Sequence, residues 1–221
     1  MVLVALSAAA CGGDKPPRSS VDAVIAVNTP AGGGASPAAG DASAVAGSTR
    51  FEAAGAEIYL PDTYEGGDPS VDVGVIVERL KQLGPDFAPL AETIEKNPSA
   101  FAMIAVDASG DYPGANVNIT KQSVLSTDSV ESEMKSLDRR LPPSFHVRET
   151  SIVTFDRFTA GRAIVDASAG AEHLTELIYF TKEGKTAMWG VAFTAMERDF
   201  DELLAVFERS MRTFKLPPGT Q

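Results

Sequence analysis

The chain divides near residue 50, and this division limits which part of it can form a compact domain. Residues 12–50 consist mostly of Gly, Ala, Ser, Pro, Val and Asp, with no aromatic residue and no sustained helical or strand periodicity. Such a segment cannot bury enough apolar surface to offset the entropy lost on ordering it. We therefore predict a disordered, flexible linker over residues 11–50 and one globular domain over residues 51–221. As a coil, residues 12–50 would span about 31–37 Å.

The single cysteine of the chain, Cys11, has the sequence context of a lipid-attachment site. It directly follows the apolar stretch Met1–Ala10, which ends in three alanines. An apolar core of about 7–15 residues followed by small residues is typical of a secretory signal peptide. No Lys or Arg lies within the stretch, so we expect residues 1–10 to be the remainder of a signal peptide that starts upstream. We expect Cys11 to carry acyl chains such as palmitate.

The net charge of the chain comes entirely from the predicted domain. The first 50 residues hold three basic and three acidic side chains, so residues 51–221 carry the whole formal net charge of −11. An acidic domain is repelled by nucleic-acid phosphates and by anionic lipid headgroups. We therefore expect no nucleic-acid partner, and we expect contact with a membrane only through the covalent lipid. The expected location is the bacterial cell envelope, with the domain outside the cytoplasm.

Hydrophobic periodicity predicts an α+β domain in which helices pack on one antiparallel sheet. Residues 61–70 are rich in Gly, Pro and Asp and are predicted to form a loop. Thr127 or Asp128 is expected to cap the third helix. The predicted strands are residues 56–60, 101–107, 115–122, 146–155, 159–167, 173–182 and 186–194, and the predicted helices are residues 71–83, 86–97, 128–141 and 197–214.

The order of these elements resembles the Mog1/PsbP-like fold, which includes bacterial lipoproteins of the LpqN type. Four short motifs carry the resemblance: Tyr59-Leu60-Pro61, Ala115-Asn116-Val117-Asn118-Ile119, Gly161-Arg162-Ala163, and Phe207 with Ser210 and Phe214 in the last helix. The resemblance covers about residues 51–216. It implies a binding or accessory module, and it transfers no catalytic residue to this chain.

The residues that could support catalysis or metal binding are few. His146 and His173 are the two histidines, and the chain contains no G-x-S-x-G motif. A zinc site usually takes three or four His, Cys or carboxylate ligands, which two histidines distant in sequence do not supply. We expect both imidazoles to lie near the starts of strands, exposed or at the edge of the core, and we predict no catalytic residue, no metal ligand and no cofactor.

Two groups of acidic residues are candidate calcium ligands. Asp62, Glu65, Asp68 and Asp72 form one group, and Asp107 and Asp111 form the other. Neither has the tight alternate spacing of a calcium loop, so we expect solvated acids in loops and turns. Asn118 fits a glycosylation acceptor, a match that we attribute to chance.

Aromatic residues near the last two strands leave two interpretations open. Tyr179, Phe180, Trp189 and Phe193 could line an apolar pocket or cover the buried face of a sheet. We expect the domain to bind a partner, either an envelope protein or a small apolar ligand. Two alternatives remain: a hydrolase of unrecognised type that uses His146 or His173, and a cytosolic interaction module of the same fold.

Overall fold

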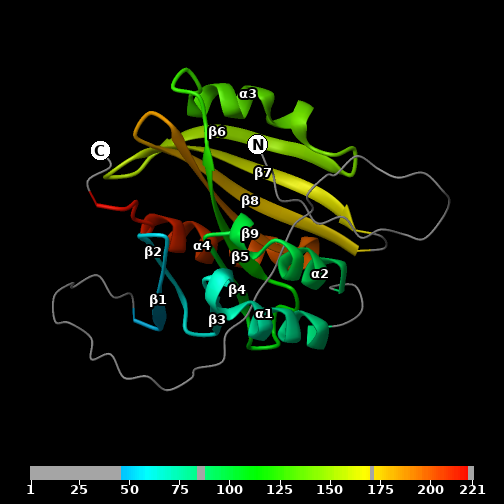
Figure 1. Cartoon of the computed structure of the whole chain (residues 1–221). Helices are drawn as coiled ribbons and strands as arrows, with labels where there is room; N and C mark the ends of the chain where they lie inside the picture. Colours follow the sequence, from blue (N-terminus) through cyan, green and yellow to red (C-terminus); the bar gives the residue numbers. More distant parts are fainter. Residues whose placement is uncertain (1–45, 84–87, 170–171, 219–221) are drawn as a thin grey trace.

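The computed structural model describes residues 46–83, 88–169 and 172–218, and the predicted α+β architecture is confirmed (Figure 1). Strands β1 (Ser48–Ala53) and β2 (Ala56–Pro61) form a small antiparallel sheet. A second, fully antiparallel sheet has the strand order β3-β4-β5-β9-β8-β7-β6. Its strands are β3 (Tyr64–Gly67), β4 (Met103–Asp107), β5 (Asn116–Ser123), β6 (Phe145–Thr154), β7 (Thr159–Ala169), β8 (Glu172–Glu183) and β9 (Ala187–Met196).

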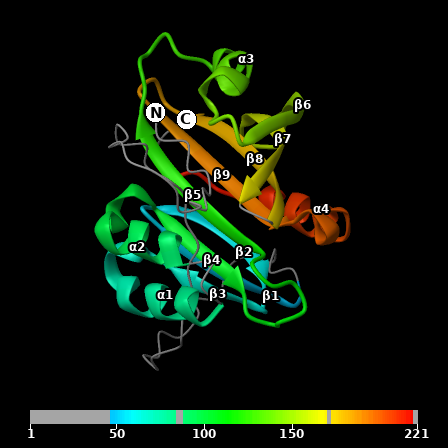
Figure 2. The ribbon, with the colours of Figure 1, turned by 90° about the vertical axis from the view of Figure 1, so that its right-hand side faces the viewer.

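Helices cover both faces of the seven-stranded sheet (Figure 2). Helices α1 (Pro69–Leu83), α2 (Ala88–Lys96) and α3 (Val130–Arg140) pack on one face, and the short 3-10 helix η2 (Pro98–Ala100) follows α2. Helix α4 (Glu197–Arg212) and the β1–β2 hairpin pack on the other face. Because side chains alternate along a strand, each central strand contributes to two separate hydrophobic cores.

The last helix shows how the sequence determines this packing. Phe200, Leu203, Phe207 and Met211 recur at helical spacing and are all buried against the sheet. Acidic residues occupy the first turn of α4, and Arg209 and Arg212 lie in its last turn. The helix macrodipole stabilises negative charge at the first end and positive charge at the other. The predicted amphipathic helix is therefore confirmed.

Four local predictions were wrong. The expected loop 61–70 contains β3, and β1 includes Ser48 to Arg50 of the expected linker. The hairpin β1–β2 forms a separate sheet, so the domain has two antiparallel sheets where one was predicted. Helix α3 is capped by Ser129, whose hydroxyl and backbone exchange hydrogen bonds with Ser132. Ser132, at the third helical position, therefore completes a capping box with Ser129.

Candidate functional site

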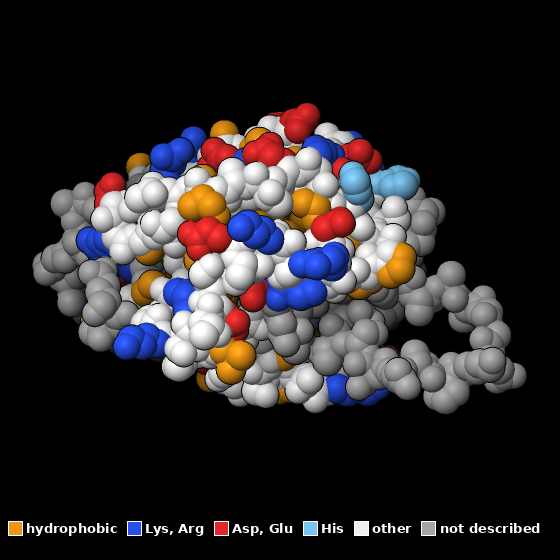
Figure 3. All heavy atoms as spheres, turned by 90° about the horizontal axis from the view of Figure 1, so that it is seen from above, with side chains coloured by type: hydrophobic (Ala, Val, Ile, Leu, Met, Phe, Trp, Pro, Cys, Tyr) orange, Lys and Arg blue, Asp and Glu red, His pale blue; other side chains and the backbone are white. Residues whose placement is uncertain are grey.

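The lipid-attachment residue proposed from the sequence, Cys11, lies outside the described residues. Both histidines lie at the surface near strand ends, as expected (Figure 3). Asp166 lies opposite His146 in the sheet, but its carboxylate accepts hydrogen bonds from Arg148 and from the Thr175 hydroxyl. Within the described residues, no hydrogen bond or ion pair joins either imidazole to a serine or an acid.

The acidic groups considered as calcium ligands have local structural roles. The Asp62 carboxylate accepts a hydrogen bond from the Thr49 hydroxyl at 2.7 Å, and Asp68 accepts one from the Ser70 backbone N–H at 2.8 Å at the start of α1. The Asp107 carboxylate accepts hydrogen bonds from the backbone N–H and the hydroxyl of Ser109 in the turn between β4 and β5. The side chain of Asp72 is not described. Across residues 46–83, 88–169 and 172–218, no three His, Cys, Asp or Glu side chains are grouped to hold a metal ion.

The aromatic side chains near the last strands belong to the cores. Trp189 and Phe193 are buried on the face covered by α4, together with Tyr179, whereas Phe180 faces the opposite core. These four side chains therefore cover the sheet and do not line a common pocket. Asn118 is also buried within the sheet, which makes the sequence match to a glycosylation acceptor inaccessible in the folded domain.

A row of buried polar side chains crosses the face covered by α1, α2 and α3. Thr194 of β9 lies between Glu176 of β8 and Asn116 of β5 in the strand register, and all three are buried. Burial raises the pKa of Glu176 to about 8, because a charged carboxylate is poorly solvated there. Asn116 Nδ2 donates to the Gly114 carbonyl at 2.9 Å, while its Oδ1 has no hydrogen-bond partner within the described chain.

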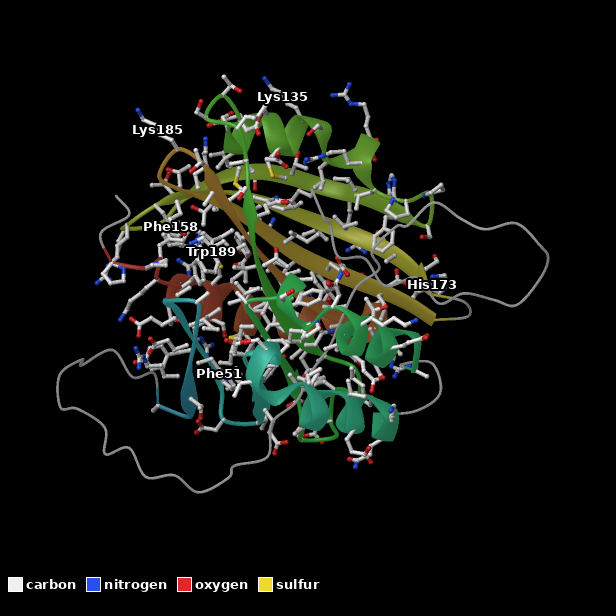
Figure 4. The ribbon with its side chains drawn as sticks, in the orientation of Figure 1. Phe51, Lys135, Phe158, His173, Lys185 and Trp189 are labelled. Carbon is white, nitrogen blue, oxygen red and sulfur yellow. The ribbon has the colours of Figure 1, made fainter. Side chains whose placement is uncertain are left out.

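A hollow of about 530 Å³ opens at one end of the molecule, on the face covered by α4. Tyr59 of β2, the β6–β7 loop and the segment after α4 surround it. Figure 4 shows Phe158 and Trp189 at this end of the sheet and His173 at the opposite end. A second hollow, of about 240 Å³, shares Tyr59 and Thr213 with the first and is also lined by Arg209 and by residues 46–48.

Aromatic rings form the apolar part of the larger hollow. The Phe155 backbone N–H donates to the Phe158 carbonyl at 2.9 Å, which closes the β6–β7 loop. The two rings lie 4.9 Å apart between centroids, and Phe158 meets the buried ring of Phe214 edge-on at 5.9 Å. Phe155 and Phe158 are only partly buried, so part of their ring surface is exposed in the hollow. The other side of Phe158 packs against the core at Phe214.

Cationic side chains form the polar part of the same hollow. Arg157 of the loop and Arg212 of α4 are exposed, and neither forms an ion pair within the part of the chain that the structure describes. Lys215 forms an ion pair with Glu57 at 2.7 Å, and Asp156 is the one acidic residue in the lining. The lining therefore has an excess of positive charge in a chain whose net charge is −11.

The structure resembles that of cyanobacterial PsbP (CyanoP) from Synechocystis sp. PCC 6803, with a TM-score of 0.50 and 12% identity over 81% of this chain and 98% of that chain. Its fold is the Mog1/PsbP-like fold. Two other structures with the fold were also found. LpqN of Mycobacterium tuberculosis, involved in cell envelope biogenesis, has a TM-score of 0.48 and 12% identity over 74% of this chain and 83% of its own. The Saccharomyces cerevisiae Ran-binding protein Mog1p has a TM-score of 0.44 and 8% identity over 76% and 94%.

No protein-family model matches this Mog1/PsbP-like chain, and a comparison with curated proteins finds no match. Among the described residues, no helix is both long and apolar enough to cross a membrane. The larger hollow was not predicted from the sequence. Its local signal is the run Phe155-Asp156-Arg157-Phe158, in which two aromatics flank a charged turn between strands. The remaining walls come from β2 and the segment after α4, which only the folded chain brings to this loop.

Proposed function

We propose that this chain is a lipoprotein of the bacterial cell envelope, held to a membrane through Cys11, with its acidic Mog1/PsbP-like domain outside the cytoplasm. The observation that carries the anchor is the apolar stretch Met1–Ala10 with its final small residues directly before the single cysteine. The domain would act as a non-catalytic binding or accessory module. The partner would be an envelope protein, with a small apolar ligand as the alternative.

The position of the chain at the start of the domain supports this arrangement. Ala46, Gly47 and Ser48 line the smaller hollow beside Arg209, so a tether from Cys11 would join the domain at the end that carries both hollows. The negative charge of the domain opposes direct adsorption to anionic lipid, which is why the proposal places membrane contact on the covalent lipid.

Incorporation of radiolabelled palmitate tests the anchor, with the chain expressed in a bacterial host behind a complete lipoprotein signal peptide that supplies the expected upstream start. The parent protein and a Gly12→Ser control should be labelled, while Cys11→Ser should lose the label and leave the membrane fraction. Equal labelling of parent and Cys11→Ser would refute the lipid anchor. An intact Met1 and an unmodified Cys11 thiol, found by mass spectrometry of the cellular protein, would favour the cytosolic alternative instead.

A pull-down from detergent-solubilised envelope tests the binding role, with full-length parent protein compared with full-length Cys11→Ser. A partner that binds the domain should be retained by both proteins, whereas a lipid-dependent contaminant should be lost with the lipid. A truncation at residue 51 is unsuitable as a control, because β1 begins at Ser48 and its pairing with β2 would be cut.

A further inference from the structure

We propose that the larger hollow binds a small organic anion, in which an acidic group is attached to a flat apolar body. Tyr59, Phe155, Phe158, Arg157 and Arg212 make the site. This inference rests on the binding role proposed above and is independent of the lipid anchor, so either can fail without the other.

The size of the hollow fits a small molecule. Ligand sites typically enclose about 300–1,000 Å³ and combine apolar walls with a few polar groups. The hollow encloses about 530 Å³ and has this composition, with aromatic rings on the loop side and guanidinium groups at two positions. Its floor is rigid, because Phe158 packs edge-on against the buried ring of Phe214, which in turn lies 6.2 Å from the Trp189 ring.

The charges of the lining select an anion. A guanidinium presents a planar set of N–H donors that matches a carboxylate, sulfonate or phosphate. The Lys215 ammonium is already engaged by Glu57, and Asp156 offsets one of the two arginines. A favourable positive charge remains at Arg157 and Arg212, and Arg209 adds a third cation in the adjoining hollow.

The exposed aromatic rings favour a ligand whose acidic group is attached to an apolar group. Phe155 and Phe158 are partly buried beside the two arginines. Aromatic faces of this kind stack on flat apolar groups. An inorganic anion would leave these faces in contact with water, whereas an aromatic acid would cover the rings and meet the guanidinium groups together.

Titration of the full-length protein with 8-anilinonaphthalene-1-sulfonate, followed by its fluorescence, tests the site. Its uncharged analogue N-phenyl-1-naphthylamine is titrated in parallel. The double variant Arg157→Gln/Arg212→Gln should raise the Kd of the sulfonate by about tenfold or more, as expected for loss of charged hydrogen bonds. It should leave the Kd of the uncharged analogue unchanged.

The variant Arg139→Gln/Arg198→Gln is the matched control, because it removes two exposed arginines outside the lining and changes the net charge equally. Arg139 lies on α3, which packs on the opposite face of the sheet, and Arg198 lies in the first turn of α4, whereas Arg212 ends that helix. It should bind both probes as the parent does. A third variant, Phe158→Leu, should weaken binding of both probes, with its fold checked by circular dichroism. The proposal is overturned by absent binding of the sulfonate to the parent, by an unchanged Kd in the arginine double variant, or by equal weakening in the control.

Discussion

Glu57 and Lys215 are joined by three contacts that hold the segment after α4 against β2. The Glu57 backbone N–H donates to the Lys215 carbonyl at 3.0 Å, and the Lys215 N–H donates to the Glu57 carbonyl at 2.8 Å. Lys215 Nζ lies 2.7 Å from Glu57 Oε1. Tyr59 lies two residues after Glu57, and Phe214 directly precedes Lys215. These three contacts therefore set the distance between two walls of the hollow.

Glu57→Gln should lower the free energy of unfolding by about 1–2 kcal/mol at pH 7. The Lys215 ammonium holds the pKa of Glu57 below its ordinary value, and Arg50 acts in the same direction. A lowered folded-state pKa gives stability that is present above about pH 4.5 and is lost as the pH falls through the folded pKa. The difference between parent and variant in urea unfolding should therefore vanish in acid.

Glu52→Gln provides the matched control for this ion pair. Glu52 lies opposite Glu57 in the hairpin and contacts Arg50 at 2.8 Å. The side chains of Arg50 and Glu52 are both about half exposed. Such a pair contributes about 0.5 kcal/mol or less. An effect of Glu52→Gln as large as that of Glu57→Gln would show that the burial of the Lys215 pair has no special role.

Two glycines should respond in opposite directions to the same substitution. A Cβ at Gly66 of β3 would lie 2.1 Å from the Ile104 carbonyl oxygen and 2.4 Å from the Ala105 Cα, both backbone atoms of β4. Gly66→Ala should therefore push the strands apart and destabilise the domain by about 3 kcal/mol or more. Gly74 is exposed within α1, and its added Cβ meets nothing within 4 Å. Gly74→Ala should stabilise by up to about 1 kcal/mol, and thermal unfolding of both variants measures the contrast.

Arg162 joins the sheet to α4, and its removal should be costly. Its side chain is 11% exposed and contacts Glu149 at 2.6 Å and Glu208 of α4 at 3.0 Å. Arg162→Ala should destabilise by about 2–3 kcal/mol, because it leaves the Glu208 carboxylate without its cation and removes packed carbon atoms. Arg162→Lys should restore part of this loss, since one ammonium cannot match both carboxylates.

Arg148→Ala is the corresponding surface control. Arg148 makes two contacts with Asp166, but the two side chains are 43% and 34% exposed. Its removal should cost less than about 1 kcal/mol. Chemical denaturation of the three arginine variants compares these costs, and an equal loss for Arg148→Ala and Arg162→Ala would contradict the proposed role of the α4 contact.

Most of the fold could be predicted because its elements have strong periodicity. The seven predicted strands and four predicted helices all exist, with boundaries shifted by a few residues. The two missed strands lack this signal. Strand β3 reads Tyr-Glu-Gly-Gly, and its glycines are poor strand formers. Its Gly66 is required by the close approach of β4, a contact that no local pattern encodes.

The candidate site could be predicted only in part. The sequence leaves a pocket and a sheet face open for the aromatic residues Trp189 and Phe193, and the structure buries both on a face of the sheet. The hollow combines Tyr59, the loop at Phe158 and Arg212 of α4, which are separated by more than 150 residues at the extremes. Their meeting depends on the packing of α4 across the sheet, so single segments of sequence carry no sign of it.

Glu176→Gln should remove a pH-dependent loss of stability. Glu176 is buried in the middle of the sheet, and burial raises its pKa from 4.5 to about 8. A raised folded-state pKa gives stability that is complete below about pH 4.5 and is lost as the pH rises toward about 8, with a slope of about 1.4 kcal/mol per pH unit. The amide resembles the protonated acid and cannot ionise, so the variant should become the more stable protein at neutral and alkaline pH.

Urea unfolding of parent and Glu176→Gln between pH 5 and pH 9 measures this difference, which should grow with pH and level off above about 8. Glu95→Gln is the control, since Glu95 is an exposed carboxyl on α2. A difference that stays constant with pH for Glu176→Gln would show that the buried carboxyl is ionised in the folded domain throughout this range. The carboxylate would then need a cationic partner or water beside Asn116 and Thr194, and the polar row would be a solvated channel instead of a dry part of the core.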